Sequence, residues 1–206
     1  MAKKISQAVV KRLPRYYRYL EMLEQEGESR VSSGRLAEML DITASQVRQD
    51  FCNFGGFGQQ GYGYDVKKLK GELKKIMGLD KRYDMIIIGA GHIGSALAGY
   101  AGFSSEGFVV HKMFDIDTSK GEVNGIEVRH IDTLADYVEH NNVDIAVLTV
   151  QRSVAPIVAD QLVKLGIKHI WNFAPIDLDV PADVIVENIS MSESLYVLSY
   201  RMNNKD

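Results

Sequence analysis

A glycine-rich segment after a short apolar run contains the residues best suited to hold a ligand. The run DMIII (84–88) has the composition of a buried parallel strand, and it leads into Gly89-Ala90-Gly91-His92-Ile93-Gly94 and then into the helix-like SALAGYAG. Gly89 allows a tight turn, Gly91 lets a diphosphate approach the backbone, and Gly94 lets helix and strand pack closely. The spacing therefore predicts a dinucleotide site with the diphosphate at the helix N-terminus.

A carboxylate follows at the distance that this kind of site requires. Asp115 ends the second apolar run, FVVHKMFD, 21 residues after Gly94. It can accept hydrogen bonds from the hydroxyls of the adenosine ribose, and its charge repels a 2′-phosphate. We therefore expect NADH and NAD⁺ rather than NADPH and NADP⁺. Coenzyme A and a site that has lost its ligand remain the alternatives.

The second half of the chain continues as alternating strands and helices. We predict helices over 133–141 and 154–165 and strands over 144–150, 169–172 and 184–187. This pattern indicates an α/β fold with a Rossmann-like doubly wound parallel sheet, and it places Thr149-Val150 and Phe173-Ala174 after strands, where ligands bind. The histidines show no spacing typical of metal ligands. We expect no metal site and no catalytic residues.

The first half predicts a DNA-binding fold. Apolar residues recur at helical spacing from Ser6 to Glu26, with Pro14 expected to bend or start the main helix and Gly27 to end it. Ser32 or Ser33 can then cap a helix to about Leu40, and Thr43 or Ser45 a second one to about Phe54. Two short helices joined by a tight turn form a helix-turn-helix.

The second of these helices has the side chains of a recognition helix. It exposes Ser45, Gln46, Arg48 and Gln49, and Gln and Arg can pair with base edges in the major groove. The segment GGFGQQGYGYDV follows, and its glycines and aromatics predict a two-stranded hairpin with Gln59-Gln60 at the tip. A hairpin at this place is the wing of a winged helix, next to DNA.

Charge divides the chain in the same way. Residues 1–82 hold 16 Lys and Arg against 10 Asp and Glu, a net charge of +6, whereas residues 83–206 hold 8 against 17, a net charge of −9. A basic first half suits a polyanion. We predict a winged-helix domain over 1–80, a dinucleotide-binding domain over 81–188 and a dimerisation helix over 189–206. Its apolar stripe (Met191, Leu195, Leu198, Met202) favours a homodimer.

No apolar run approaches the roughly 20 residues that span a bilayer, and no apolar segment of a signal peptide follows the basic start. The chain has one cysteine, Cys52, which excludes an internal disulfide. We therefore expect a cytoplasmic protein without membrane contact.

Taken in order, these segments resemble the Rex family of redox-sensing transcriptional repressors over nearly the whole chain. The segments that carry the resemblance are RLPRYYRYL, VSSGRLAEML, SQVRQDFCNFGGFGQQGYGYDV, GAGHIGSALAGYAGF, LTV, NFAP and VEN. The wing segment joined to this glycine spacing is the most specific. The resemblance implies a homodimer that binds a palindromic operator in double-stranded DNA and releases it when NADH binds near the subunit interface, with the C-terminal helices exchanged.

The resemblance also implies roles for particular residues. The dinucleotide would contact Gly89, Ala90, Gly91, His92, Ile93, Gly94, Asp115, Thr149 and Val150, with Tyr100, Phe173 and Ala174 near the nicotinamide. DNA would contact Arg30, Ser32, Ser33, Ser45, Gln46, Arg48, Gln49, Gly58, Gln59, Gln60, Gly61 and Tyr62. Arg18, Tyr100 and Ser190 would couple the two domains.

Two positions depart from the family pattern. Many members carry a basic residue at the wing tip, where this chain has Gln59-Gln60, and some carry an Asp after VEN, where it has Ser190. An Asp–Arg switch between the domains is therefore not expected.

The rival functions are an NAD-dependent dehydrogenase and a coenzyme A-binding regulator. Only about 120 residues follow the winged helix, too few for a dinucleotide domain plus a substrate domain, and no acid–base pair accompanies the predicted nicotinamide pocket. A DNA-binding protein with a vestigial nucleotide fold is a third possibility.

Overall fold

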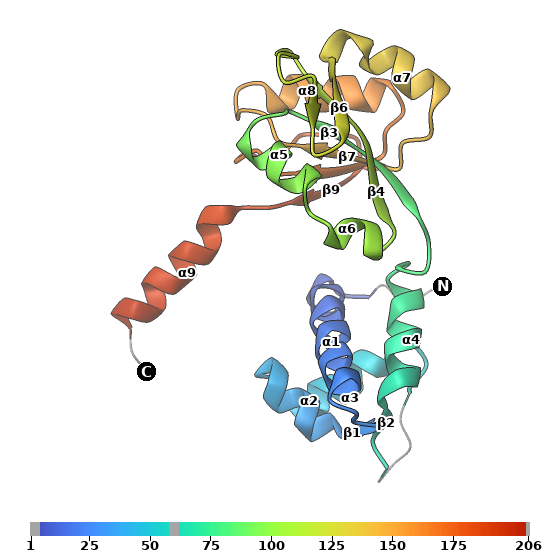
Figure 1. The fold of residues 1–206 in the computed structure, drawn as a ribbon. Helices are drawn as coiled ribbons and strands as arrows, with labels where there is room; N and C mark the ends of the chain where they lie inside the picture. The colour runs from blue at the N-terminus through green and yellow to red at the C-terminus, as the bar shows by residue number, and fades with distance from the viewer. Residues whose placement is uncertain (1–4, 58–61, 205–206) are drawn as a thin grey trace. The chain divides into compact units, whose positions relative to one another are not determined.

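The computed structural model describes residues 5–57 and 62–204. The chain divides into two compact units, Met1–Lys81 and Arg82–Asp206, each of which is described by itself (Figure 1). None of the helices in the described part is long and apolar enough to cross a membrane.

The first unit is built on a long amphipathic helix, α1 (Gln7–Gln25). Ser6 caps it by accepting a hydrogen bond from the Val9 N–H, and Gly27 follows it with a φ of +81°. Its buried residues recur every three or four positions, so that one face enters the core. Pro14 lies inside α1, so the expectation that the helix starts there is wrong; the preceding turn is already helical.

The helix-turn-helix is confirmed at the predicted positions. Ser32 caps α2 (Ser33–Leu40), and Thr43 caps α3 (Ala44–Cys52) through a capping box with Gln46. Asp41 adopts a left-handed conformation with a φ of +58°, which turns the chain sharply between the helices. Leu36, Val47 and Phe51 pack in the core of this unit.

The prediction of a hairpin within the wing segment is wrong, because the strand at its end pairs with a strand outside that segment. Residues 55–57 form no strand; instead β2 (Tyr64–Asp65) pairs antiparallel with β1 (Arg30–Val31), which precedes α2. A Cβ at Gly63 would lie 2.6 Å from the Val31 carbonyl oxygen, so the two strands approach closely there. Gln59-Gln60, with Gly58 and Gly61, lies outside the described residues. Helix α4 (Val66–Ile76) follows and packs on α1.

The second unit is a seven-stranded sheet in the order β5-β6-β4-β3-β7-β8-β9. The strands are β3 (Tyr83–Ile88), β4 (Phe108–Asp115), β5 (Glu122–Val123), β6 (Ile126–His130), β7 (Ile145–Leu148), β8 (His169–Asn172) and β9 (Ile185–Asn188). All pairs are parallel except β5 with β6. The six parallel strands have the 3-2-1-4-5-6 order of a dinucleotide-binding sheet, whose order reverses between β3 and β7.

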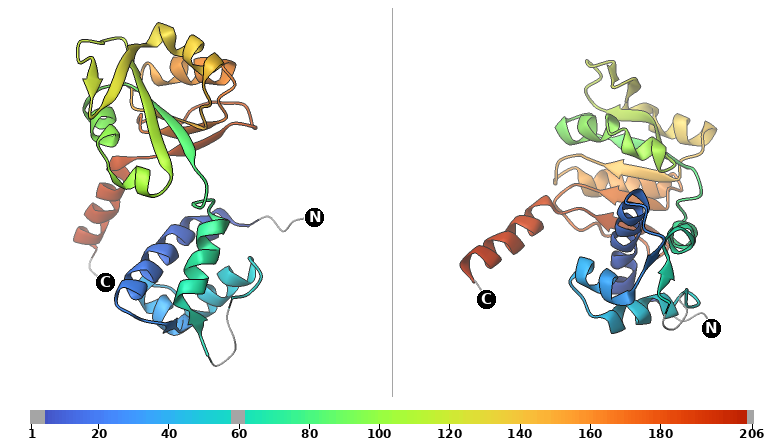
Figure 2. Two further views of the ribbon diagram at one scale, coloured as in Figure 1. Left: turned by 45° about the vertical axis from the view of Figure 1, so that its right-hand side comes forward. Right: turned by 60° about the horizontal axis from the view of Figure 1, so that its bottom comes forward.

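Helices cover both faces of this sheet, as Figures 1 and 2 show. The helices are α5 (His92–Ala98), α6 (Gly102–Ser105), α7 (Leu134–His140), preceded by the short η1 (Ile131–Thr133), and α8 (Ala155–Lys164). Side chains of α7 and α8 share one apolar core with Ile86 and Ile88, while α5 and α6 share the other with Met85 and Ile87. Strand β3 is therefore buried on both faces, as its unbroken apolar run predicted.

Two features complete this unit. The β5–β6 hairpin, which the sequence analysis did not predict, turns at Asn124 and Gly125, both with positive φ. Helix α9 (Met191–Asn203) confirms the predicted terminal helix, and all of its side chains are exposed in the single chain.

Candidate dinucleotide site and DNA-binding surface

The three glycines of the loop after β3 meet three different spatial requirements. Gly89 has a φ of +105°, and a Cβ there would lie 2.8 Å from the Thr149 carbonyl oxygen. A Cβ at Gly94 would lie 2.0 Å from the Gly89 carbonyl oxygen, whereas one at Gly91 would meet nothing within 4 Å. Gly89 and Gly94 are thus required by the fold, and Gly91 leaves space where a diphosphate can approach.

Asp115 holds this loop from the end of β4. Its Oδ2 accepts a hydrogen bond of 2.5 Å from the Ala90 N–H, and its Oδ1 accepts one of 3.0 Å from the Asp117 N–H. Lys120 holds the next peptide unit of the loop, because its Nζ donates to the Ala90 carbonyl oxygen at 2.5 Å. No local sequence motif marks Lys120.

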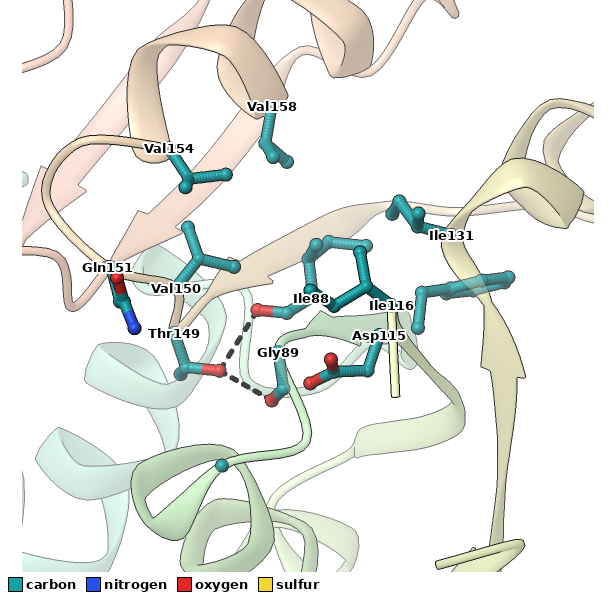
Figure 3. A pocket seen from close by; sticks show the side chains of 12 residues that line it. Ile88, Gly89, Asp115, Ile116, Ile131, Thr149, Val150, Gln151, Val154 and Val158 are labelled. Atoms are coloured by element: carbon teal, nitrogen blue, oxygen red, sulfur yellow. Dashed lines mark hydrogen bonds between the residues drawn. The ribbon is translucent and has the colours of Figure 1, made fainter. Parts of the chain in front are cut away.

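A pocket of about 310 Å³ opens at the switch point between β3 and β7 (Figure 3). Gly89, Gly91, Asp115, Thr149 and Val150, all predicted for the site, line it. The further lining residues are Ile88, Phe114, Ile116, Ile131, Gln151, Val154 and Val158.

The polar and apolar parts of this pocket are separate. The Thr149 hydroxyl donates to the carbonyl oxygens of Ile88 and Gly89, at 3.0 and 2.8 Å, next to Asp115 (Figure 3). Ile116, which also lines the pocket, is 78% exposed although it is apolar. A carboxylate beside an exposed apolar surface fits an adenosine, which presents ribose hydroxyls and a flat base.

The residues predicted for the nicotinamide do not line this pocket. Tyr100 and Phe173 belong instead to a series of four aromatic rings, in which the centroids of Tyr100 and Phe103 lie 4.8 Å apart, those of Phe103 and Trp171 5.7 Å, and those of Trp171 and Phe173 4.7 Å. Ala174 is buried beside β8. Phe103 and Trp171, which sequence reasoning missed, lie between Tyr100 and Phe173 in this series.

The residues predicted to couple the two domains, Arg18, Tyr100 and Ser190, lie in different segments of the chain. The Arg18 guanidinium lies 5.2 Å from the ring of Tyr19 in the first unit. Ser190 precedes α9 without capping it through its side chain. Their coupling to Tyr100 remains a prediction.

The histidines hold no cluster that could bind a metal within residues 5–57 and 62–204. His111 instead pairs with Asp84 across β4 and β3, at 2.7 Å, and this hydrogen bond lowers the pKa of the Asp84 carboxyl.

The predicted DNA-binding side chains lie on the exposed face of α3 and next to it. The Arg48 guanidinium donates to the hydroxyls of Ser33 and Ser45, both at 3.0 Å, so α2 and α3 together hold it. The Gln46 Oε1 accepts from the Thr43 N–H at 2.9 Å, which gives Gln46 a capping role besides its predicted contact with bases. Gln49 and Ser32 are exposed.

Arg30 links β1 to the segment before β2. Its Nη1 donates to the Tyr62 carbonyl oxygen at 2.9 Å, and its guanidinium lies 5.9 Å from the centroid of the Tyr62 ring. Arg30 and Tyr62 thus contact each other, and their contact with DNA remains a prediction.

The inner face of α3 holds a carboxylate that sequence reasoning missed. Asp50 is 2% exposed, accepts two hydrogen bonds from Arg12 and accepts a third from the Tyr16 hydroxyl. Burial, followed by the bond to Asp50, raises the pKa of Tyr16. An acidic residue that directly follows two polar ones, as in Arg48-Gln49-Asp50, gives no sequence signal of burial.

Comparisons with known proteins agree with the division of the chain. Residues 4–52 match the family described as putative DNA-binding protein N-terminus, and residues 80–176 match the CoA binding domain family.

Curated relatives match over nearly the full length. The chain is 50% identical to the redox-sensing transcriptional repressor Rex of Thermoanaerobacter pseudethanolicus over 98% of this chain and 92% of the relative. It is also 50% identical to the Rex repressor of Clostridioides difficile, over 97% of this chain and 96% of the relative.

Solved structures match equally well. A crystal structure of RSP in complex with NAD⁺ and operator DNA is 50% identical, with a TM-score of 0.91, over 98% of this chain and 94% of that one. The protein in a crystal structure of RSP in complex with NADH is 47% identical, with a TM-score of 0.90, over 98% of this chain and 95% of that one.

Proposed function

The chain belongs to the Rex family of redox-sensing transcriptional repressors, and on this basis we propose that it binds operator DNA as a homodimer and releases it when NADH binds. The observation that carries the proposal is the presence, in one chain, of a helix-turn-helix with an exposed Arg48 and a sheet whose switch point holds a glycine loop and Asp115. We further propose that each winged helix reads one half of a palindrome.

Three features of the second unit support NAD(H) as the ligand. Gly91 leaves space for the diphosphate, Asp115 can accept from the adenosine ribose, and the apolar residues near Ile116 can hold the base. His92, Ile93 and Gly94 would present their backbone N–H groups, and Thr149 and Val150 would line the opposite side.

The reduced nicotinamide is neutral, whereas the oxidised ring carries a positive charge. Transfer of a charged ring from water into an apolar pocket is costly, so a neutral, partly apolar nicotinamide pocket would favour the reduced ring. This preference would be the basis of redox sensing.

Release of DNA then follows from linkage. NADH can displace DNA only if it binds the released form more tightly, and operator DNA must weaken NADH binding by the same factor. The test is a titration of NADH with and without saturating operator. We expect a weaker NADH affinity in the presence of operator; equal affinities would refute the proposed coupling.

Coenzyme A is a second candidate, because the family model over 80–176 is that of a CoA binding domain. Coenzyme A carries a phosphate on its adenosine ribose, and Asp115, at the place predicted for that ribose, would repel it. Competition should therefore show that coenzyme A displaces NADH only weakly. Displacement at equal concentrations would favour coenzyme A.

We also propose that the chain is not an enzyme and acts in the cytoplasm, as a repressor without catalytic residues. Its relatives are transcriptional repressors. Incubation of the protein with NAD⁺ and a panel of alcohols or 2-hydroxy acids should yield no NADH; steady turnover would revive the dehydrogenase alternative.

A further inference from the structure

Three hydrogen bonds converge on one buried carboxylate of the recognition helix. Arg12 donates to Asp50 through Nε at 2.7 Å and through Nη2 at 2.8 Å, and the Tyr16 hydroxyl donates to the Asp50 Oδ2 at 2.9 Å. Arg12 and Tyr16 are four residues apart on α1, so both lie on the same face of that helix. Two consecutive turns of α1 thus hold a single side chain of α3.

The other contacts of α3 with the core are apolar and less directional. Val47 and Phe51 complete its buried face, and the Tyr16 and Phe51 rings lie 4.8 Å apart between centroids. Apolar packing tolerates small rotations and shifts, whereas a bidentate Arg–carboxylate pair fixes both distance and angle. Only one arrangement of α3 against α1 keeps all three hydrogen bonds of Asp50.

Stability alone does not account for a charge at this position. Replacing a buried ion pair by apolar residues of similar volume is often neutral or stabilising. The ion pair therefore matters for the orientation of α3 rather than for stability. Arg48 and Gln49, which directly precede Asp50 in the chain, lie on the exposed side of this helix.

We propose that Asp50, held by Arg12 and Tyr16, is a positioning residue for operator recognition: it sets the rotation of α3 and so aims Arg48 at its base. The inference rests on the proposed function, since it assumes that α3 reads DNA. A base contact is strongly directional, whereas phosphate attraction is not. Loss of the Asp50 cluster should therefore reduce specific binding and leave non-specific binding nearly unchanged.

The test uses the full-length protein and two duplexes of equal length and composition, a palindromic operator selected from a random pool and its scrambled version, at one salt concentration. The triple variant R12M/Y16F/D50L removes the cluster, keeps the net charge and fills the space with apolar atoms. We expect it to keep or raise the melting temperature and to lower the ratio of operator affinity to scrambled-duplex affinity by roughly tenfold, the loss of about one base contact.

The matched control is E24L/K70M. Glu24 of α1 and Lys70 of α4 form another partly buried ion pair in the same unit, but it does not involve α3, and the double variant also keeps the net charge. Its affinity ratio should equal that of the wild type. If Asp50 only stabilised the fold, its loss would reduce the folded fraction of the protein and so lower the affinities for both duplexes together.

A folded triple variant with an unchanged ratio would overturn the inference. If the triple variant does not fold, Tyr16→Phe decides, because it keeps the ion pair and the ring contact with Phe51 and removes one hydrogen bond. We expect its ratio to fall by roughly threefold, and an unchanged ratio would contradict the inference. A wild type without preference for any duplex would instead refute the proposed function itself.

Discussion

Asp115 has two tasks in the proposed dinucleotide site. In the structure its Oδ2 holds the Ala90 N–H and so shapes the glycine loop, and Asp115 also lines the pocket, where we propose that it accepts from the adenosine ribose. A carboxylate can accept about four hydrogen bonds, so both tasks are compatible.

The first prediction concerns this carboxylate. Asp115→Ala should raise the Kd of NADH by about 10- to 100-fold, because hydrogen bonds to a charged group contribute about 1.5–3 kcal/mol. Energy transfer from Trp171, the single tryptophan of the chain, to the reduced nicotinamide provides the measurement. Asp117→Ala, two residues away, is the control and should bind normally. An unchanged Kd for Asp115→Ala would remove Asp115 from the site.

The second prediction concerns Arg48. Its guanidinium is held by Ser33 and Ser45 in the absence of DNA, so little side-chain entropy is lost on binding. Arg48→Ala should cost about 1–3 kcal/mol of operator affinity and leave the NADH Kd unchanged.

Fluorescence anisotropy with a labelled operator measures this effect. Arg35→Ala is the control, since it removes the same charge from the neighbouring helix, where Arg35 faces Glu38 at 3.8 Å. Arg48 would have no role in reading DNA if the two variants bound equally well.

Local motifs explain which site residues could be predicted. Gly89, Gly94 and Asp115 could be predicted because the tight turn, the close helix–strand packing and the ribose contact of a dinucleotide site fix their spacing. Lys120 and Asp50 were not, because each acts on a segment 30 or more residues away, and nothing in the local sequence shows that partner.

Among the helices and strands, apolar periodicity was sufficient to predict the long helices and the buried strands. It failed for short strands. Tyr64–Asp65 was predicted as part of a strand, but its partner, Arg30–Val31, is far away in sequence and two residues long. The β5–β6 hairpin was missed although Asn124-Gly125 is the dipeptide most typical of a two-residue turn between antiparallel strands.

We expect the stability of the second unit to depend on pH through Asp84 of β3, which pairs with His111 of β4. The His111 hydrogen bond lowers the pKa of Asp84 from its usual value of 3.8. A lowered folded-state pKa stabilises the fold above the unfolded-state pKa, and this contribution is lost as the pH falls.

The third prediction follows from this sign. Asp84→Asn should reduce the free energy of unfolding by about 1 kcal/mol at pH 7, and the difference from the wild type should shrink as the pH falls through the lowered folded-state pKa of Asp84. Urea unfolding at several pH values measures it. The exposed pair Lys75–Glu72 on α4 provides the control through Glu72→Gln. A difference independent of pH would show that the Asp84 charge is not involved.

At the scale of the whole molecule, α9 requires a partner. Its apolar side chains are more than half exposed, among them Leu195 at 63% and Leu198 at 53%. An apolar helix surface of this kind marks an interface. A two-fold dimer would bury it and present two recognition helices to a palindrome.

The fourth prediction tests this role. Leu195→Glu/Leu198→Glu should shift the protein from dimer to monomer in sedimentation velocity and weaken binding to the full palindrome far more than to a half-site. Glu193→Gln on the same helix is the control. A double variant that stays dimeric would place the subunit interface elsewhere.

In the proposed function, the redox state of the dinucleotide controls DNA binding. Its most direct test is the anisotropy of a labelled palindromic operator at fixed salt, because affinity depends on salt, while NADH and then NAD⁺ are added to the bound protein. We expect NADH to lower the anisotropy to that of free DNA and NAD⁺ alone to leave the complex intact. DNA that stays bound at saturating NADH, or that both dinucleotides release equally, would contradict it.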